Sequence, residues 1–178
     1  ETELMLADLD SVERRLASLA KKLRGGDQDV QDQDRLLRAA QAALAEGKPA
    51  RTVKVSEDDA KNWGMLQLLT AKPVLYVCNV EEASAAAGNS LSTKVAERAK
   101  AEGAASVVIS AKIEEELAQM PAEDAALFLE EMGLHEAGLD RLIRAAYDLL
   151  GLQTYFTVGP KEARAWTITK GTLAPQAA

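Results

Sequence analysis

The sequence predicts an α/β protein in which a helical hairpin precedes part of a parallel sheet and an antiparallel β-hairpin follows it. Apolar residues recur at helical spacing over residues 9–44. Two continuous apolar runs, at residues 73–78 and 105–109, are separated by a stretch of helical character, as in a β-α-β unit with parallel strands. β-Branched and aromatic residues then gather over residues 154–169 on both sides of a turn.

The composition is ordinary for a soluble globular protein and argues against two classes of partner. The 178 residues carry a formal net charge of −7, and no segment is long and apolar enough to span a membrane. Nucleic-acid binding over the whole surface needs a basic footprint, although a local basic patch stays compatible with RNA. We therefore expect no membrane and no sequence-specific DNA. The single cysteine, Cys78, indicates a reducing, cytoplasmic compartment.

Residues 1–70 are predicted to form a helical hairpin with flanking helices. Two apolar series support the hairpin, and a Gly25-Gly26 turn separates them. The first series is Leu9, Val12, Leu16, Leu19 and Leu23, and the second is Val30, Leu37 and Leu44. Such spacing is typical of two antiparallel helices that pack along a coiled-coil-like seam.

The segment after this hairpin is predicted to be less regular. Val53 and Val55 alternate with charged residues in a short, strand-like link. Ser56 followed by Asp59 resembles a capping box, which predicts a helix that runs from there to about Leu69.

Residues 71–150 are predicted to form a parallel α/β layer. Residues 73–78 fit a strand that is buried on both faces, and residues 105–109 fit a second buried strand. Further helices are expected around residues 114–119, 123–132 and 139–150.

The helix between the two strands carries its own start and stop signals. Asn89 or Ser90 can cap its beginning, and Gly103 can end it after Glu102. The glutamates at 114–116 are expected to lie in a solvated first turn of the next helix.

Residues 151–178 are predicted to begin with an antiparallel hairpin. Residues 154–158 and 164–169 read as its strands, and Gly159-Pro160 lies in the turn between them.

Polar residues follow both predicted parallel strands, where ligands bind in open α/β sheets. The first strand runs into the sequence Asn79, Val80, Glu81, Glu82, and the second into Ser110, Ala111, Lys112. Proteins of the GTPase superfamily carry an Asn-Lys-x-Asp motif after one strand and a Ser-Ala-Lys motif after the next, and together these hold the base. The sequence therefore predicts a base-binding site at this edge of the sheet.

The altered first motif favours adenine over guanine. A guanine-reading Asp accepts hydrogen bonds from N1–H and the N2 amine, whereas adenine has an unprotonated N1 and no such amine. Here Glu82 stands in that place, and Val80 replaces the usual lysine. The amide of Asn79 can accept from adenine N6 and donate to N7. The plainer alternatives are a strand-end turn residue for Asn79 and a solvated helix-start carboxylate for Glu82.

These motifs stand within longer blocks that resemble the YchF branch of the Obg-like P-loop NTPases, a branch of ribosome-associated ATPases. The resemblance spans essentially all 178 residues. Its blocks are residues 2–9 (TELMLADL), 47–51 (GKPAR), 72–80 (KPVLYVCNV), 109–114 (ISAKIE), 155–159 (YFTVG), 163–168 (ARAWTI) and 170–175 (KGTLAP).

The resemblance implies three parts and a nucleotide. Residues 1–70 would be the helical hairpin insertion, residues 71–150 the C-terminal half of the nucleotide-binding domain, and residues 151–178 the first hairpin of a β-grasp TGS domain. It also implies preference for ATP over GTP through an Asn-x-x-Glu motif and binding to the ribosome, as the 50S subunit or the 70S particle. The implied base-site residues are Asn79, Val80, Glu82, Ser110, Ala111 and Lys112.

The phosphate-binding half of such a site is missing from these residues. No Gly-x-x-x-x-Gly-Lys-[Ser/Thr] sequence and no Asp-x-x-Gly loop occurs, so this chain supplies no catalytic residue and no ligand for Mg²⁺. We expect an internal fragment that lacks the P-loop and most of the TGS domain, and that is inactive alone although the full protein hydrolyses ATP. Two alternatives stay open: a non-catalytic interaction module with a vestigial nucleotide site, and an ordinary GTPase.

Overall fold

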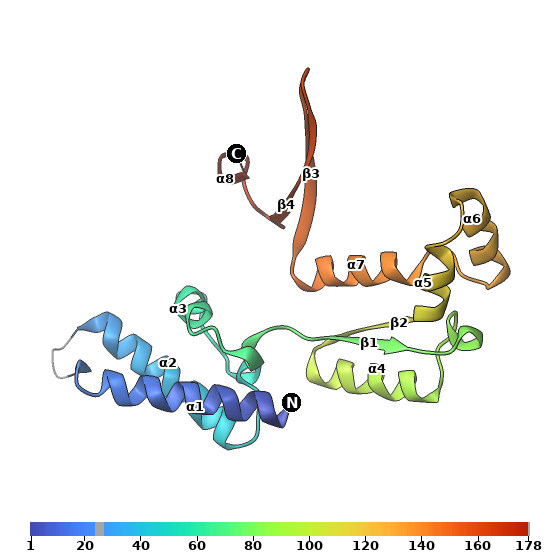
Figure 1. Cartoon of the computed structure of the whole chain (residues 1–178). Helices are drawn as coiled ribbons and strands as arrows, with labels where there is room; N and C mark the ends of the chain where they lie inside the picture. Colours follow the sequence, from blue (N-terminus) through green and yellow to red (C-terminus); the bar gives the residue numbers. More distant parts are fainter. Residues whose placement is uncertain (24–26, 178) are drawn as a thin grey trace. The chain divides into compact units, whose positions relative to one another are not determined.

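The computed structural model describes residues 1–23 and 27–177, and its chain divides into two compact units, Glu1–Pro73 and Val74–Ala178 (Figure 1). It is a mixed α/β structure with one parallel and one antiparallel strand pair, as predicted. No helix within the described ranges is both long and apolar enough to cross a membrane.

Two long helices form the core of the first unit. Helix α1 (Thr2–Leu19) and helix α2 (Gln28–Ala45) pack on each other (Figure 1), and Val12 and Leu37 are fully buried between them. The predicted turn at Gly25-Gly26 lies outside the described residues. Asp27 begins α2 by accepting a hydrogen bond from the backbone N–H of Asp29 at 3.0 Å, the usual role of a capping aspartate.

The helix predicted to run to Leu69 is shorter than expected. Helix α3 spans Ala60–Met65, and Gln67 then adopts a left-handed backbone conformation with φ of 52°. The turn is required because Leu66 and Leu68 are both buried in the core. In a continuous helix, residues two apart point to different faces and would not enter the same core together.

A buried carboxylate from α1 holds the next turn of the chain. Asp8, 3% exposed, accepts hydrogen bonds from the backbone N–H groups of Leu69 and Thr70, each at 2.8 Å, and from the Thr70 hydroxyl at 2.7 Å. Residues Leu69–Ala71 form a 3₁₀ turn here, like Ala50–Thr52 earlier. The strand-like link predicted at Val53 and Val55 is wrong: neither residue belongs to a strand.

A parallel strand pair organises the second unit. Strand β1 (Leu75–Asn79) pairs with β2 (Ala105–Ile109), and helix α4 (Ser90–Glu102) connects them. Asn89 caps α4 by accepting from the N–H groups of Leu91 and Ser92, and Gly103 ends it with φ of 67°, as the sequence predicted.

The expectation that the first strand is buried on both faces is wrong. Val77, in the middle of β1, is 46% exposed. Within the described sheet β1 has one partner strand, and helix α7 packs mainly on β2. Because α7 covers β1 less fully than β2, apolar side chains of β1 stay partly exposed.

Three further helices follow β2: α5 (Ala111–Leu117), α6 (Ala122–Glu131) and α7 (Gly138–Leu149). Glu114 is not the solvated helix-start residue that the sequence suggested. Its carboxylate accepts hydrogen bonds from the N–H groups of Gly138 at 2.7 Å and Leu139 at 3.1 Å. These N–H groups lie in the first turn of α7 and have no partner inside the helix, and a negative charge at this end of a helix is stabilising.

The chain continues into an antiparallel pair, β3 (Leu152–Val158) and β4 (Ala163–Thr169), and a short helix α8 (Ala174–Ala177). On one face the indole N–H of Trp166 donates to the Thr157 hydroxyl at 2.8 Å. The Arg164 guanidinium lies 5.7 Å from the centre of the Trp166 ring, within the range of a cation–π contact.

Candidate functional site

The carboxyl ends of β1 and β2 lie at the same edge of the parallel pair. Asn79, the last residue of β1, is in register with Ile109, the last residue of β2. One residue further on, the backbone N–H of Val80 donates to the carbonyl of Ile109 at 2.9 Å. The two polar segments selected from the sequence therefore leave the sheet side by side.

A hydrogen bond joins these two segments directly. The side-chain oxygen of Asn79 accepts from the backbone N–H of Ala111 at 2.9 Å. This N–H belongs to the first turn of α5 and has no partner inside the helix. Asn79 thus satisfies a helix terminus and ties the loop after β1 to the loop after β2.

The outer side of this edge carries an ion pair. The ammonium group of Lys112 contacts a carboxylate oxygen of Glu82. Hydrogen bonding to Glu82, and then its negative charge, raises the pKa of Lys112 above its usual value. Their side chains are 36% exposed for Glu82 and 67% exposed for Lys112, so the pair lies at the rim and is open to solvent.

Between the segments lies a recess of about 390 Å³, which we call the base recess. This volume falls in the range of small-molecule sites. The lining residues are Asn79, Val80, Glu81, Glu82, Ala83, Ser110 and Lys112.

Two of the lining residues are buried. Val80 offers an apolar side chain. Ser110 is 2% exposed, and its hydroxyl oxygen has no hydrogen-bond partner among the residues that the structure describes. A buried polar atom without a partner costs free energy, so this hydroxyl is a candidate contact for a bound molecule.

The structure brings all six predicted base-site residues together. Five of them line the recess, and Ala111 takes part through its backbone N–H. Whether they bind a nucleotide base remains a prediction. Cys78, next to Asn79, is partly buried in β1. Across the described ranges, no group of three or more His, Cys, Asp or Glu side chains is arranged to hold a metal ion.

Sequence reasoning missed the residues that hold the loop after β1. The carboxylate of Glu81 accepts hydrogen bonds from the Ser84 hydroxyl at 2.5 Å and from the Asn89 side-chain amide at 3.3 Å. The hydrogen bond from Ser84 is the main cause of a pKa for Glu81 below its usual value. Asn89 was predicted as a helix cap, and its second contact had no separate signal in the sequence.

The chain is similar in sequence to known proteins. Residues 152–178 match the family model described as "YchF-GTPase_C: Protein of unknown function (DUF933)". The "Ribosome-binding ATPase YchF" of Bacillus subtilis is 45% identical over 178 residues, which are 99% of this chain and 49% of that protein. The protein of the same name from Escherichia coli O157:H7 is 42% identical over 177 residues, which are 99% of this chain and 48% of that protein.

A solved structure is also similar to this one. The "Structure of the Schizosaccharomyces pombe YchF GTPase" superposes with a TM-score of 0.85 at 30% sequence identity, and the match covers 99% of this chain and 49% of that chain. The chain therefore spans about half the length of the relatives it matches. The names of these relatives differ in the nucleotide, because the bacterial proteins are called ATPases and the Schizosaccharomyces pombe protein a GTPase.

Proposed function

Because this chain belongs to the YchF family, we propose that it provides the base-binding half of the nucleotide site of a ribosome-associated ATPase. In this proposal residues 1–70 are a coiled-coil hairpin insertion, residues 71–150 are part of the nucleotide-binding domain, and residues 151–178 begin a TGS domain. ATP is the substrate, and the protein works with ribosomes in the cytoplasm.

The observation that carries the proposal is the hydrogen bond between Asn79 and Ala111. It joins the loops that follow two neighbouring parallel strands, beside a recess of the size of a small-molecule site. An asparagine amide beside such a recess has the donor and acceptor that adenine N7 and N6 require.

The charge arrangement at the rim supports adenine over guanine. Guanine would need a carboxylate that is free to accept from N1–H and the N2 amine. The Glu82 carboxylate is instead paired with the Lys112 ammonium. Breaking that pair to bind guanine would cost part of the binding energy, whereas adenine makes no such demand.

Mg²⁺ does not fit the residues of this chain, so no step through the metal is derived from them. The described residues hold no group of three or more His, Cys, Asp or Glu side chains arranged to bind a metal ion, and the sequence has no P-loop serine or threonine. Residues of this chain bind and orient the base. Cleavage of the phosphate would depend on a P-loop in the protein that contains this chain.

Competition between ATP and GTP tests the proposal. A protein of the length of its relatives that contains this chain would be loaded with a fluorescent ATP analogue and titrated with each nucleotide. We expect the concentration of ATP needed to displace the analogue to be roughly tenfold or more below that of GTP. Equal displacement, or stronger displacement by GTP, would favour an ordinary GTPase, in line with the name of the Schizosaccharomyces pombe relative.

Turnover separates the enzyme from a non-catalytic module. In the same protein we expect ATP hydrolysis that is lost when the P-loop lysine is replaced by alanine, because that lysine holds the phosphates. Absence of hydrolysis in both forms, with and without ribosomes, would support an interaction module with a vestigial site.

A further inference from the structure

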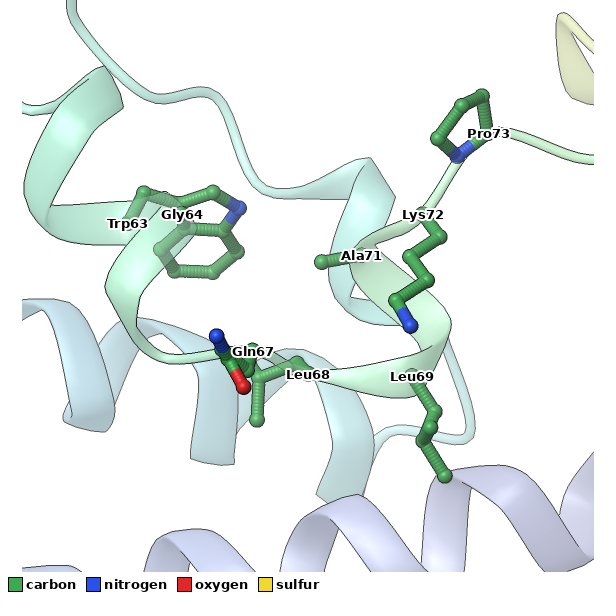
Figure 2. A pocket seen from close by; sticks show the side chains of 8 residues that line it. All are labelled: Trp63, Gly64, Gln67, Leu68, Leu69, Ala71, Lys72 and Pro73. Atoms are coloured by element: carbon green, nitrogen blue, oxygen red, sulfur yellow. The ribbon is translucent and has the colours of Figure 1, made fainter.

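A second recess lies in the unit Glu1–Pro73, between α3 and the 3₁₀ turn Leu69–Ala71 (Figure 2). Its volume is about 590 Å³, which is enough for a short peptide segment. We call it the Trp63 cleft. It belongs to the helical unit and shares no lining residue with the base recess.

The walls of the Trp63 cleft are largely apolar. The indole ring of Trp63 lines it with Leu68, Leu69 and Pro73. Leu68 is buried in the helical core, whereas Leu69 is 45% exposed. The cleft therefore offers apolar lining surface, which favours a ligand with a large apolar group.

Three polar groups of the cleft lack partners. Figure 2 shows the Trp63 indole and the Gln67 amide on one side of the opening, and the Lys72 ammonium reaching toward it from the other. No hydrogen bond or ion pair engages these three side chains within the ranges that the structure describes. The indole N–H and the ammonium can only donate, whereas the amide can both donate and accept.

Hydrogen bonds hold the backbone turn at Gln67, on the floor of the cleft. The left-handed conformation of Gln67, with φ of 52°, is unusual for a residue other than glycine. It is held by a hydrogen bond from the Gln67 N–H to the Gly64 carbonyl at 3.1 Å and by the bond from the Leu69 N–H to Asp8 at 2.8 Å. The turn that carries the Gln67 amide is thus held in place, which lowers the entropy cost of a contact with this group.

From this arrangement we propose that the Trp63 cleft binds a peptide segment of a partner protein that carries a carboxylate beside a large apolar side chain. The indole N–H, the amide N–H groups and the ammonium match a carboxylate, and Lys72, the one cation among the described lining residues, matches one negative charge. A phosphate backbone would need several cations, more than these lining residues provide. The apolar walls receive the neighbouring side chain.

The tryptophans allow a direct test by NMR. The chain has two, Trp63 in the cleft and Trp166 in the β3–β4 pair, so Trp166 is an internal control. The ¹⁵N-labelled chain would be titrated with acetylated, amidated Leu-Glu-Leu and with the matched Leu-Gln-Leu peptide. We expect the Trp63 indole signal to shift and saturate, with the Glu peptide binding roughly tenfold more tightly, while the Trp166 signal stays still.

Two variants complete the test. Lys72→Gln removes the cation and should reduce the preference for the Glu peptide to less than about twofold. Lys61→Gln removes an exposed lysine of α3 outside the lining and should leave the preference unchanged. A Trp63 signal that does not move, equal binding of both peptides, a preference that survives Lys72→Gln, or equal shifts of both tryptophans would each overturn the proposal.

Discussion

The backbone N–H of Ala111 donates to the side-chain oxygen of Asn79 at 2.9 Å, across the carboxyl end of the parallel strand pair. Because a backbone N–H can only donate, the amide oxygen must face Ala111 and the NH₂ group must face away from it. One lone pair of the oxygen is thereby used. The NH₂ group remains available to donate to adenine N7, and a contact of the same oxygen with N6 depends on its second lone pair.

Replacing Asn79 by aspartate separates the structural role of this residue from base binding. The carboxylate of Asn79→Asp can still accept from Ala111, so we expect the thermal midpoint to change little. The donor to N7 is lost and a negative charge is added. In the protein that contains this chain and has the length of its relatives, the affinity for ATP should therefore fall by roughly tenfold or more. Isothermal titration calorimetry checks the affinity. Unchanged affinity with an intact fold would remove Asn79 from the proposed base contact.

The base preference should respond to the two altered motif positions. The double change Glu82→Asp with Val80→Lys restores the residue types of the guanine-reading motif. We expect the ratio of ATP to GTP affinity to fall by roughly tenfold or more, because an aspartate can accept from guanine N1–H and the N2 amine. Competition binding measures the ratio. A ratio equal to that of the unmodified protein would show that our argument on base recognition is wrong.

Asp8 is predicted to be the most sensitive carboxylate of the helical unit. Asp8→Ala leaves the N–H groups of Leu69 and Thr70 without their acceptor in a buried region. We expect the free energy of unfolding to fall by about 3 kcal/mol or more. The matched control is Asp10→Ala, which removes an exposed ion pair with Arg14 and should cost about 1 kcal/mol or less. Urea denaturation, followed by far-UV circular dichroism, compares the two variants. Equal losses in the free energy of unfolding would contradict this role of Asp8.

Replacing Gly138 and Gly64 by alanine should change the stability of the chain in opposite directions. A Cβ atom at Gly138 would lie 2.8 Å from the Glu114 carboxylate and 3.1 Å from Ile109 Cβ, so Gly138→Ala should destabilise the chain by about 1–3 kcal/mol. A Cβ at Gly64, inside α3, meets nothing within 4 Å, so Gly64→Ala should stabilise it by roughly 0.5–1 kcal/mol. Thermal denaturation of both variants gives the two signs. A neutral Gly138→Ala would mean that the start of α7 tolerates the displacement.

The strands and their shared edge could be predicted from sequence because the signals are local. The apolar runs locate β1 and β2, and Asn89 and Gly103 mark the ends of the helix between them. The connection through a helix makes a parallel pair, and this brings Asn79 and the segment after Ile109 to one edge. The coiled-coil character of the helices, the three-part division and the base-binding roles stay predictions.

The polar contacts that hold the turns could not be predicted in the same way. Asp8 and Glu114 stand among other charged residues of helical segments, so the sequence gives them the appearance of solvated side chains. Their partners lie far along the chain, at Thr70 and Gly138, and no local pattern connects them. The left-handed turn at Gln67 was missed for a related reason, since burial of Leu66 and Leu68 depends on the packing of α1 and α2.

The most direct test of the central claim is a crystal structure, with a non-hydrolysable ATP analogue, of the protein that contains this chain and has the length of its relatives. We predict that the adenine lies in the base recess, with N7 within hydrogen-bonding distance of the Asn79 NH₂ group and the ring between Val80 and the segment that begins at Ser110. An adenine bound elsewhere, with the base recess empty, would contradict the account.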